Sequence, residues 1–215
     1  MEWPFEIYDP DKIKVWIRRL GILAAVILVI LWWRHEPDAK WPGIPAPDDP
    51  GQTAGDLPPP FVHNGYTITP LAHYAITAVV LARDRYRFDT MSGICPVDLG
   101  LGWGPMSDAE RINLMDFYQS YRWMDWRVSA KNKSKLGLSP SEVNRHAANT
   151  HCIPADAAIK KTLLSVKRHD LVTLKGYLIR ANNSKNSFLS SLSRTDTGAG
   201  ACEIVFVTEI QREHP

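Results

Sequence analysis

The stretch LVTLKGYLIRA, residues 171–181, decides the fold predicted for this chain. Its aliphatic, β-branched and aromatic residues alternate, as in a strand that has two distinct faces. One face carries Leu171, Thr173, Lys175, Tyr177 and Ile179, and the other carries Val172, Leu174, Gly176 and Leu178. A glycine inside a strand marks a bulge or a tight bend, which we predict at Gly176. The pattern V-x-L-x-G-x-L is common in strands of OB-like barrels.

Further strands are predicted on both sides of this one. Residues 66–82, YTITPLAHYAITAVVLA, are rich in β-branched and aromatic types, and Pro70 interrupts them. They predict a short strand, a turn and a longer strand. Towards the C-terminus, residues 187–193 and 202–210 are predicted to form a pair of strands that is joined by RTDTGAGA, residues 194–201.

Helices are predicted at 107–119, 139–149 and 155–167. The first two begin with a capping box, in which a serine at the N-cap is followed three residues later by a glutamate. The third has apolar residues at helical spacing and lysines on its other side. The fold class is therefore α+β. We expect an N-terminal transmembrane helix and a Pro-rich linker, followed by a small, mostly antiparallel β-sheet or OB-like barrel decorated by about three helices.

The transmembrane prediction comes from LGILAAVILVILWW, residues 20–33, which contains no polar side chain. This run spans only about 21 Å as a helix, which is less than the roughly 30 Å of the hydrocarbon core. Extension back to Val15 brings the helix to about 28 Å, and Arg18 and Arg19 can then snorkel to the headgroups. A cleaved signal peptide is an alternative, but no small-x-small site follows closely, and a buried soluble helix is another.

The distribution of basic residues predicts the orientation of this helix. Lys12, Lys14, Arg18 and Arg19 precede the apolar run, so the N-terminus should lie in the cytoplasm. The predicted location is the bacterial inner membrane, with the C-terminal domain in the periplasm. Residues 35–64 are rich in proline and predict a semi-extended linker. The predicted organisation is a cytoplasmic tail at 1–12, a transmembrane helix at 13–34, the linker at 35–64 and an extracytoplasmic α+β domain at 65–215.

Net charge and cysteine content restrict the partners and the disulfides that this chain can have. The net charge of +2, from 25 basic and 23 acidic side chains, predicts no strong field for nucleic acid or another polyanion. Cys95, Cys152 and Cys202 allow at most one disulfide within the chain, and the sequence does not choose the pair. The preferred interpretation is that all of them are small buried hydrophobic residues.

RHAANTHCIPAD, residues 145–156, contains the most metal-like group, His146, His151 and Cys152. Histidines five residues apart on a helix point about 140° apart, whereas helical zinc sites use a spacing of four. We expect the helix to end near residue 149, with His151 and Cys152 in a helix–helix connection. The sequence therefore predicts no metal site and no cofactor.

Other stretches supply candidate ligand-binding residues. YRWMDWRV, residues 121–128, interleaves aromatic and charged residues that could stack on bases or sugars. TDTGAGA, residues 195–201, lacks the Lys-Ser/Thr ending of a P-loop and predicts a hairpin turn. A hydrolytic site could use Ser190, Ser191 or Ser193 as nucleophile, but no local signature supports one, so no catalytic residue is assigned. The carboxylates and imidazole of such a site could come from Asp98, Asp125, His146, Asp196 and Glu203. The candidate ligand-binding residues are Trp103, Arg122, Trp126, His146, Arg194 and Asp196.

Several ordered stretches resemble a family of uncharacterised bacterial proteins that have one N-terminal membrane segment. These stretches are PVDLGLGWGPMSD (96–108), YRWMDWRV (121–128), RHAANTHCIPA (145–155) and SSLSRTDTGAGACE (190–203). The likeness covers about residues 66–210. It implies a bacterial, membrane-anchored origin and assigns no activity.

The leading functional prediction is a non-enzymatic binding or assembly domain that acts on another membrane or envelope protein. The expected partners are the lipid bilayer, through residues 15–33, and such a protein, with no nucleic acid. One alternative is an envelope hydrolase or ligand-processing enzyme that acts near His146, Arg194 and Asp196. A second alternative is an OB-type nucleic-acid-binding domain.

Overall fold

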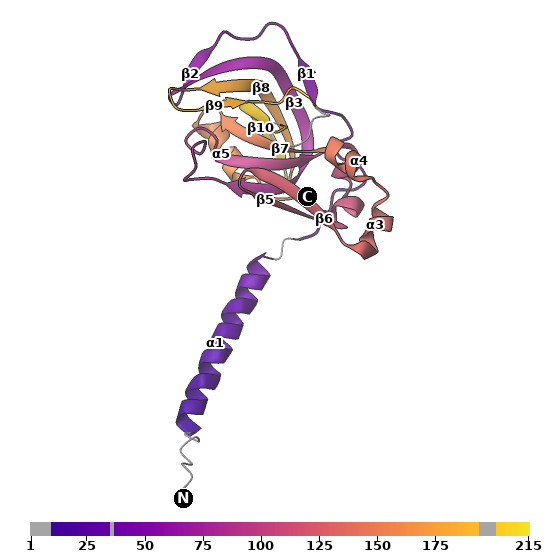
Figure 1. The fold of residues 1–215 in the computed structure, drawn as a ribbon. Helices are drawn as coiled ribbons and strands as arrows, with labels where there is room; N and C mark the ends of the chain where they lie inside the picture. The colour runs from indigo at the N-terminus through magenta and orange to yellow at the C-terminus, as the bar shows by residue number, and fades with distance from the viewer. Residues whose placement is uncertain (1–9, 35–36, 194–200) are drawn as a thin grey trace, which may run out of the picture. The chain divides into compact units, whose positions relative to one another are not determined.

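The structure, a computed structural model, describes residues 10–34, 37–193 and 201–215. The chain divides into two compact units, Met1–Pro37 and Asp38–Pro215. The first contains helix α1, Pro10–Arg34. The second contains all the described strands and the other described helices (Figure 1).

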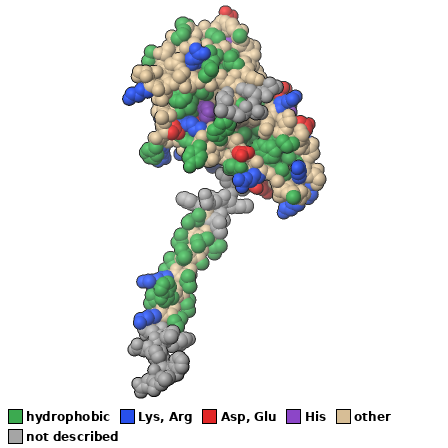
Figure 2. All heavy atoms as spheres, in the orientation of Figure 1, with side chains coloured by type: hydrophobic (Ala, Val, Ile, Leu, Met, Phe, Trp, Pro, Cys, Tyr) green, Lys and Arg blue, Asp and Glu red, His purple; other side chains and the backbone are tan. Residues whose placement is uncertain are grey.

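Helix α1 does not meet the requirements of a membrane-spanning segment. Within the described residues, no helix has both the length and the apolar content that a bilayer crossing requires. Lys14, Arg18 and Arg19 interrupt its first half, and Figure 2 shows Lys and Arg side chains there among hydrophobic ones. The predicted transmembrane helix at 13–34 is therefore wrong. The inner-membrane localisation, with a cytoplasmic N-terminus and a periplasmic domain, depends on that helix and is wrong with it.

One large sheet dominates the described part of the second unit. It has eight strands in the order β1-β3-β4-β7-β10-β8-β9, with β2 paired to β3. Because β3 also pairs with β8, the strands β3, β4, β7, β10 and β8 form a closed ring. Neighbours in the ring are antiparallel except β7 and β10, which are parallel. The strands are β1 (Gly51–Thr53), β2 (Phe61–His63), β3 (Tyr66–Arg85), β4 (Val97–Gly102), β7 (Ala147–Pro154), β8 (Leu171–Asn182), β9 (Ser187–Leu189) and β10 (Glu203–Glu213).

The largest core cluster brings together side chains from all the strands of this ring. Val80, Leu101, Leu174 and Val205 are fully buried in it, together with Leu163 from helix α5 (Ala157–Ser165), which lies between β7 and β8 in the chain. Burial of one such aliphatic side chain stabilises the fold by about 1.5–3 kcal/mol. The ring is thus held together by its apolar interior as well as by its ladders of hydrogen bonds.

Strand β8 has the alternating faces that its sequence predicts. Val172, Leu174 and Leu178 are buried, whereas Lys175 between them is exposed. A Cβ added to Gly176 would lie 1.9 Å from the carbonyl oxygen of Phe206, so only glycine allows β10 to approach this closely. The register of the β8–β10 pair shifts next to Gly176, and the extra residue lies in β10 between Val207 and Glu209.

A separate two-stranded sheet is formed by β5 (Met115–Ser120) and β6 (Trp123–Val128). Tyr121 and Arg122 connect them with φ of 50° and 64°, as in a type I′ hairpin turn. The predicted helix at 107–119 is therefore wrong over most of its length. It is reduced to η1 (Gly104–Ser107) and α2 (Ala109–Ile112), because Met115 and Phe117 are buried with strand alternation. Figure 1 shows this hairpin beside α3 (Ala130–Leu136) and α4 (Pro140–Arg145).

Helix α4 has the predicted capping box between Ser139 and Glu142. It ends at Arg145, however, so the predicted continuation to residue 149 is wrong. The following residues have enough β-branched and apolar character to form β7 between β4 and β10, and ladder pairing there outweighs local helix propensity.

The predicted fold class is wrong. The structure is a mixed α/β fold whose described part has a large eight-stranded sheet in place of the small sheet or barrel that was expected, and no described helix could cross a membrane. The predicted pairing of 187–193 with 202–210 also differs from the structure, since β9 pairs with β8. The parallel pair β7–β10 joins segments about fifty residues apart, and local sequence patterns do not reveal such a pairing.

The proline-rich stretch after residue 37 contacts the rest of the second unit. Trp41 Nε1 donates a hydrogen bond to the carbonyl oxygen of His169 at 2.8 Å. Ala46 is buried, and Asp49 accepts a hydrogen bond from Trp103 Nε1 at 2.9 Å. This stretch therefore forms part of the wall around the core.

Candidate functional site

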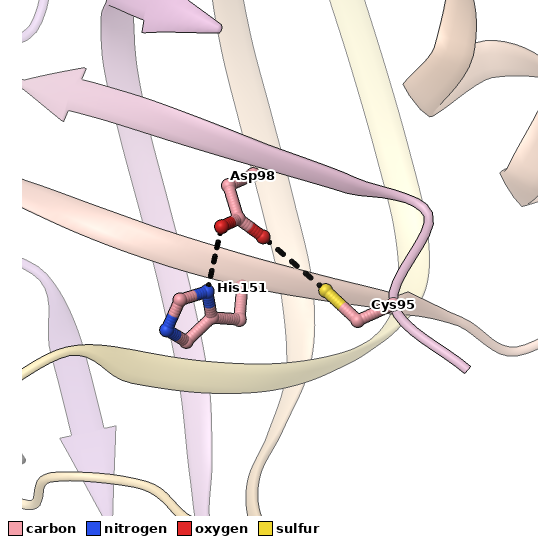
Figure 3. Close-up of side chains that lie close together, drawn as sticks. All are labelled: Cys95, Asp98 and His151. Carbon is pink, nitrogen blue, oxygen red and sulfur yellow. Dashed lines mark hydrogen bonds and ion pairs between the residues drawn. The ribbon is translucent and has the colours of Figure 1, made fainter. Parts of the chain in front are cut away.

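Asp98 and His151 lie side by side on neighbouring strands. They are register partners in the antiparallel pair β4–β7, so their side chains leave the same face of the sheet. Nδ1 of His151 is 2.9 Å from Oδ2 of Asp98. Cys95, two residues before β4, donates from Sγ to Oδ1 of Asp98 at 3.3 Å. Figure 3 shows the Asp98 carboxylate between the other two side chains.

Arg122 adds a positive charge to this buried group. Its Nη1 donates to Oδ1 of Asp98 at 2.8 Å, and its Nη2 donates to the carbonyl oxygen of Cys95 at 3.0 Å. The same guanidinium binds both carboxylate oxygens of Asp89, at 3.0 and 2.9 Å. Its carbon lies 4.0 Å from the centre of the Tyr86 ring. The tip of the β5–β6 hairpin is thus fixed to β4 through one side chain.

The protonation states follow from burial and neighbouring charge. Burial lowers the pKa of Arg122, but its hydrogen bonds to Asp89 and the negative charges around it raise this pKa above the ordinary value. Burial, with the charge of Asp98, raises the pKa of the Cys95 thiol well above its ordinary value. Arg122 is therefore cationic and Cys95 is a neutral donor, and both donate hydrogen bonds to the Asp98 side chain.

His151 is the second cation next to Asp98. Burial alone lowers its pKa, but hydrogen bonds with Asp98 and Cys202, together with their charges, raise the pKa of His151 to about 9. Its ring is therefore an imidazolium at neutral pH. Because Nδ1 faces Asp98, Nε2 is the nitrogen available to Cys202. A line of three groups results, running from Asp98 through His151 to Cys202.

Cys202 differs from the other two cysteines in its exposure. Cys95 and Cys152 are buried, whereas Cys202, just before β10, is partly exposed. The amide nitrogen of Asn149 lies 3.7 Å from its Sγ, and the backbone N–H of Ser191 donates to its carbonyl oxygen at 3.1 Å. The side chain of Asn149 is held by its hydrogen bond to the carbonyl oxygen of Arg122 at 2.7 Å. The sulfur is thus positioned by β7, β10 and the chain after β9.

Cys95, Asp98 and His151 also have the composition of a metal site. One donor atom of each lies within 4.8 Å of the others. A metal ion there would have to displace the protons of the Cys95 thiol and the His151 ring, because it binds a thiolate and a neutral imidazole. The guanidinium of Arg122, 2.8 Å from the same carboxylate, would also repel a metal ion. The residues present do not fit a metal, and no chemistry is assigned to one.

A pocket of about 870 Å³ opens beside this group. His151 and Arg122 line its base, and the aromatic side chains of Phe88, Tyr121 and Phe188 line its walls. Phe88 is 98% exposed and Tyr121 is 93% exposed, so both present apolar surface to whatever enters. Figure 2 shows hydrophobic, basic and histidine side chains together on one face of this unit.

The structure separates most of the candidate residues that the sequence suggests. Trp103 is 1% exposed in the core, and Trp126 donates from Nε1 to Asn144 at 2.9 Å. His146 is at the C-cap of α4, where its ring contacts Trp103 and the carbonyl oxygen of Glu142. Arg122 belongs to the site. Arg194 and Asp196, with most of the predicted turn, lie outside the described residues.

Several site residues were not predicted from the sequence. His151 was placed in a connection and grouped with His146, but it lies in β7, with its side chain towards Asp98. Cys202 and Asp98 are 104 residues apart and meet only through the order of the sheet. The serines considered as nucleophiles have structural contacts, since Ser190 Oγ accepts from the N–H of Ile204 at 2.9 Å. No local motif could have identified this group.

Comparison with known proteins gives no relative from which function could be transferred, since no family model, curated protein or solved structure matches this chain.

Proposed function

We propose that this protein is a cysteine-dependent acyl-transfer enzyme, acting as a hydrolase when water is the acceptor. Cys202 is the nucleophile, His151 carries the proton and Asp98 orients the imidazole and balances its charge. The observation that carries this proposal is the order of three neighbouring groups: His151 Nδ1 lies 2.9 Å from Asp98 Oδ2, and His151 also interacts with Cys202, the one partly exposed thiol among the three. Covalent catalysis of this type requires a nucleophile next to a base, and a carboxylate on the other side of the base that orients it.

In the proposed first half of the reaction, the sulfur of Cys202 reacts as a thiolate next to the His151 imidazolium, as in other cysteine nucleophiles that are paired with a histidine. The Cys202 thiolate attacks the carbonyl carbon of the substrate, and a C–S bond forms. The bond to the amine or alcohol leaving group breaks, and the proton of the His151 imidazolium passes to that group. The product of this half is a thioester on Cys202 next to a neutral imidazole. An N–H of Asn149 lies close enough to Sγ to donate to the oxygen that becomes negative during attack.

The second half restores the starting pair. A water molecule attacks the acyl carbon through its oxygen, and neutral His151 accepts a proton from that water. The C–S bond then breaks, the acid leaves, and the thiolate–imidazolium pair is restored. Asp98 keeps its place beside His151 throughout, because Arg122 remains bound to it.

Acylation by p-nitrophenyl acetate tests the proposal. The wild-type protein should release p-nitrophenolate in a burst equal to one site per chain and carry the acetyl group on Cys202, as shown by mass spectrometry. Cys202→Ala should abolish the burst, and His151→Asn should slow it by about 10²–10⁴-fold. The control, Cys152→Ser, should keep the burst, since Cys152 Sγ contacts only the Thr150 carbonyl oxygen among the described polar groups. Release no faster than with free N-acetylcysteine would contradict the proposal.

A binding role is a second candidate, and the pocket next to His151 favours it. An opening of about 870 Å³ with exposed aromatic side chains at its rim has the features of a ligand site. The two proposals differ in what Cys202→Ala should do. A binding domain would keep its ligand affinity and function in that variant, whereas an enzyme would keep only the affinity.

A further inference from the structure

Strand β9 is an edge of the large sheet, and its outer side faces no described strand. It pairs with β8 alone. An edge strand exposes a row of N–H and C=O groups that a second extended chain can pair with. This edge is therefore able to accept another strand.

The hydrogen bonds around β9 show which of its backbone groups point outward. In the β8–β9 hairpin the N–H of Asn183 donates to the carbonyl oxygen of Asn186, and that of Ser190 donates to the carbonyl oxygen of Ile179. The bonding direction alternates along an antiparallel pair, so Phe188 bonds towards β8. The N–H and C=O groups of Ser187 and Leu189 therefore face away from β8.

This edge leads to the proposed nucleophile. Two residues after Leu189, the N–H of Ser191 donates to the carbonyl oxygen of Cys202 at 3.1 Å. Ser187, Phe188 and Leu189 also line the same pocket as His151. A chain that pairs with β9 is thus carried towards Cys202, with side chains on one of its faces directed into the pocket.

The pocket is suited to side chains of a particular kind. Phe88 and Tyr121 are almost fully exposed, and Leu189 is 53% exposed, so the walls offer apolar contact. Arg85 and Arg87 line the same opening. The only carboxylate among the described lining residues, Asp89, is already bound to Arg122. The pocket therefore favours apolar side chains accompanied by a negative charge.

We infer that the substrate is an extended polypeptide segment with apolar side chains and an acidic residue, which binds as an added strand on the outer edge of β9. Main-chain hydrogen bonds to Ser187 and Leu189 supply register, and the pocket supplies side-chain selectivity, as in other cases of strand addition. The inference rests on the proposed function, since it names the substrate of the Cys202 site.

Two electrophiles test it on the full chain. One is iodoacetamide, and the other is a vinyl sulfone at the C-terminus of a heptapeptide of alternating leucine and threonine with one glutamate. The peptide reagent should label Cys202 at least tenfold faster than a vinyl sulfone without the peptide. Leu189→Pro removes an outward N–H and should cancel that acceleration, whereas Leu189→Ala keeps the N–H and should preserve most of it. Labelling by iodoacetamide, which has no main chain to pair with β9, is measured on each variant as its reference rate, and the acceleration is the ratio of the two rates.

The outcomes separate the two proposals. If the peptide gives no acceleration while iodoacetamide labels Cys202, strand addition is overturned and the reactive thiol stands. If neither reagent labels Cys202, the proposed enzyme is overturned. Binding of the fluorescein-labelled peptide to Cys202→Ala, measured by anisotropy, then tests the strand site alone. Loss of that binding in the Cys202→Ala, Leu189→Pro double variant, or on N-methylation of alternate peptide nitrogens, supports strand addition. Equal binding in every case overturns it.

Discussion

At the residue scale, Asp98 is a fully buried carboxylate between two cations. Removal of one partner of a buried ion pair leaves an uncompensated charge and typically costs 3–5 kcal/mol. The pair with Arg122 and the pair with His151 therefore contribute to stability as well as to chemistry. The two contributions can be distinguished, because the pKa of His151 is about 9 whereas that of Arg122 is raised above its already high ordinary value.

The titration of His151 predicts a pH-dependent stability. Its pKa rises from an ordinary 6.5 to about 9 on folding. The stabilisation is therefore fully present below about pH 6.5 and is lost as the pH rises through about 9. Its size should be on the order of 3 kcal/mol. Urea unfolding of the wild type and His151→Gln between pH 6 and 10 measures it. The difference between the two proteins should shrink with increasing pH, and a difference that stays constant would refute the assignment.

Arg122 gives a second prediction at this scale. Arg122→Met removes the guanidinium from Asp98 and Asp89, and we expect a loss of about 3–5 kcal/mol in the free energy of unfolding. Arg127→Met is the matched control on the same hairpin. Arg127 is exposed, and within the described residues its side chain contacts the Tyr118 ring, so the substitution should change stability by about 0.5 kcal/mol or less. Urea unfolding at pH 7 compares them, and equal losses would contradict the role given to Arg122.

At the scale of the element, the pair β8–β10 depends on the missing side chain of Gly176. Gly176→Ala places a Cβ against the Phe206 carbonyl and must separate the strands, which we expect to cost roughly 2–4 kcal/mol. Gly51→Ala is the control, since its Cβ would lie 3.7 Å from its nearest neighbour, the carbonyl oxygen of Ala75. Thermal unfolding should show a large decrease in Tm for Gly176→Ala and almost none for Gly51→Ala. Similar shifts in the two variants would argue against close strand contact.

The elements also show what the sequence can and cannot predict. The alternation of β8 and the capping box of α4 are local signals, and both are found in the structure. The sequence predicts that residues 146–149 continue the helix and that His151 lies in a connection, but β7 forms there because β4 and β10 pair on either side. The site depends on these distant pairings. The sequence identifies His151 as a metal-like residue and Asp98 as one of several candidate carboxylates, but it does not show that they pair with each other or that His151 also meets Cys202.

At the scale of the whole molecule, the second compact unit begins at Asp38, well before the first residue of the predicted domain. The proline-rich stretch supplies Ala39 and Ala46 to the buried core, and Ala39 exchanges backbone hydrogen bonds with the Asn113 side chain at 2.8 and 3.0 Å. Proline restricts the unfolded chain, so its ordering here costs little conformational entropy. The boundary of the folding unit therefore lies on the N-terminal side of this stretch.

Two truncations test this boundary. A chain of residues 38–215 should unfold cooperatively in urea with nearly the free energy of the full chain, because it keeps the whole second unit. A chain of residues 61–215 loses the hydrogen bond from Trp41 to His169 and the cover over Trp103. It also loses the burial of Ala39, Ala46 and Trp41. Together these changes should lower the free energy of unfolding by several kcal/mol. Equal stability of the two fragments would show that the proline-rich stretch is dispensable, whereas a large difference places it inside the fold that holds Asp98, His151 and Cys202 together.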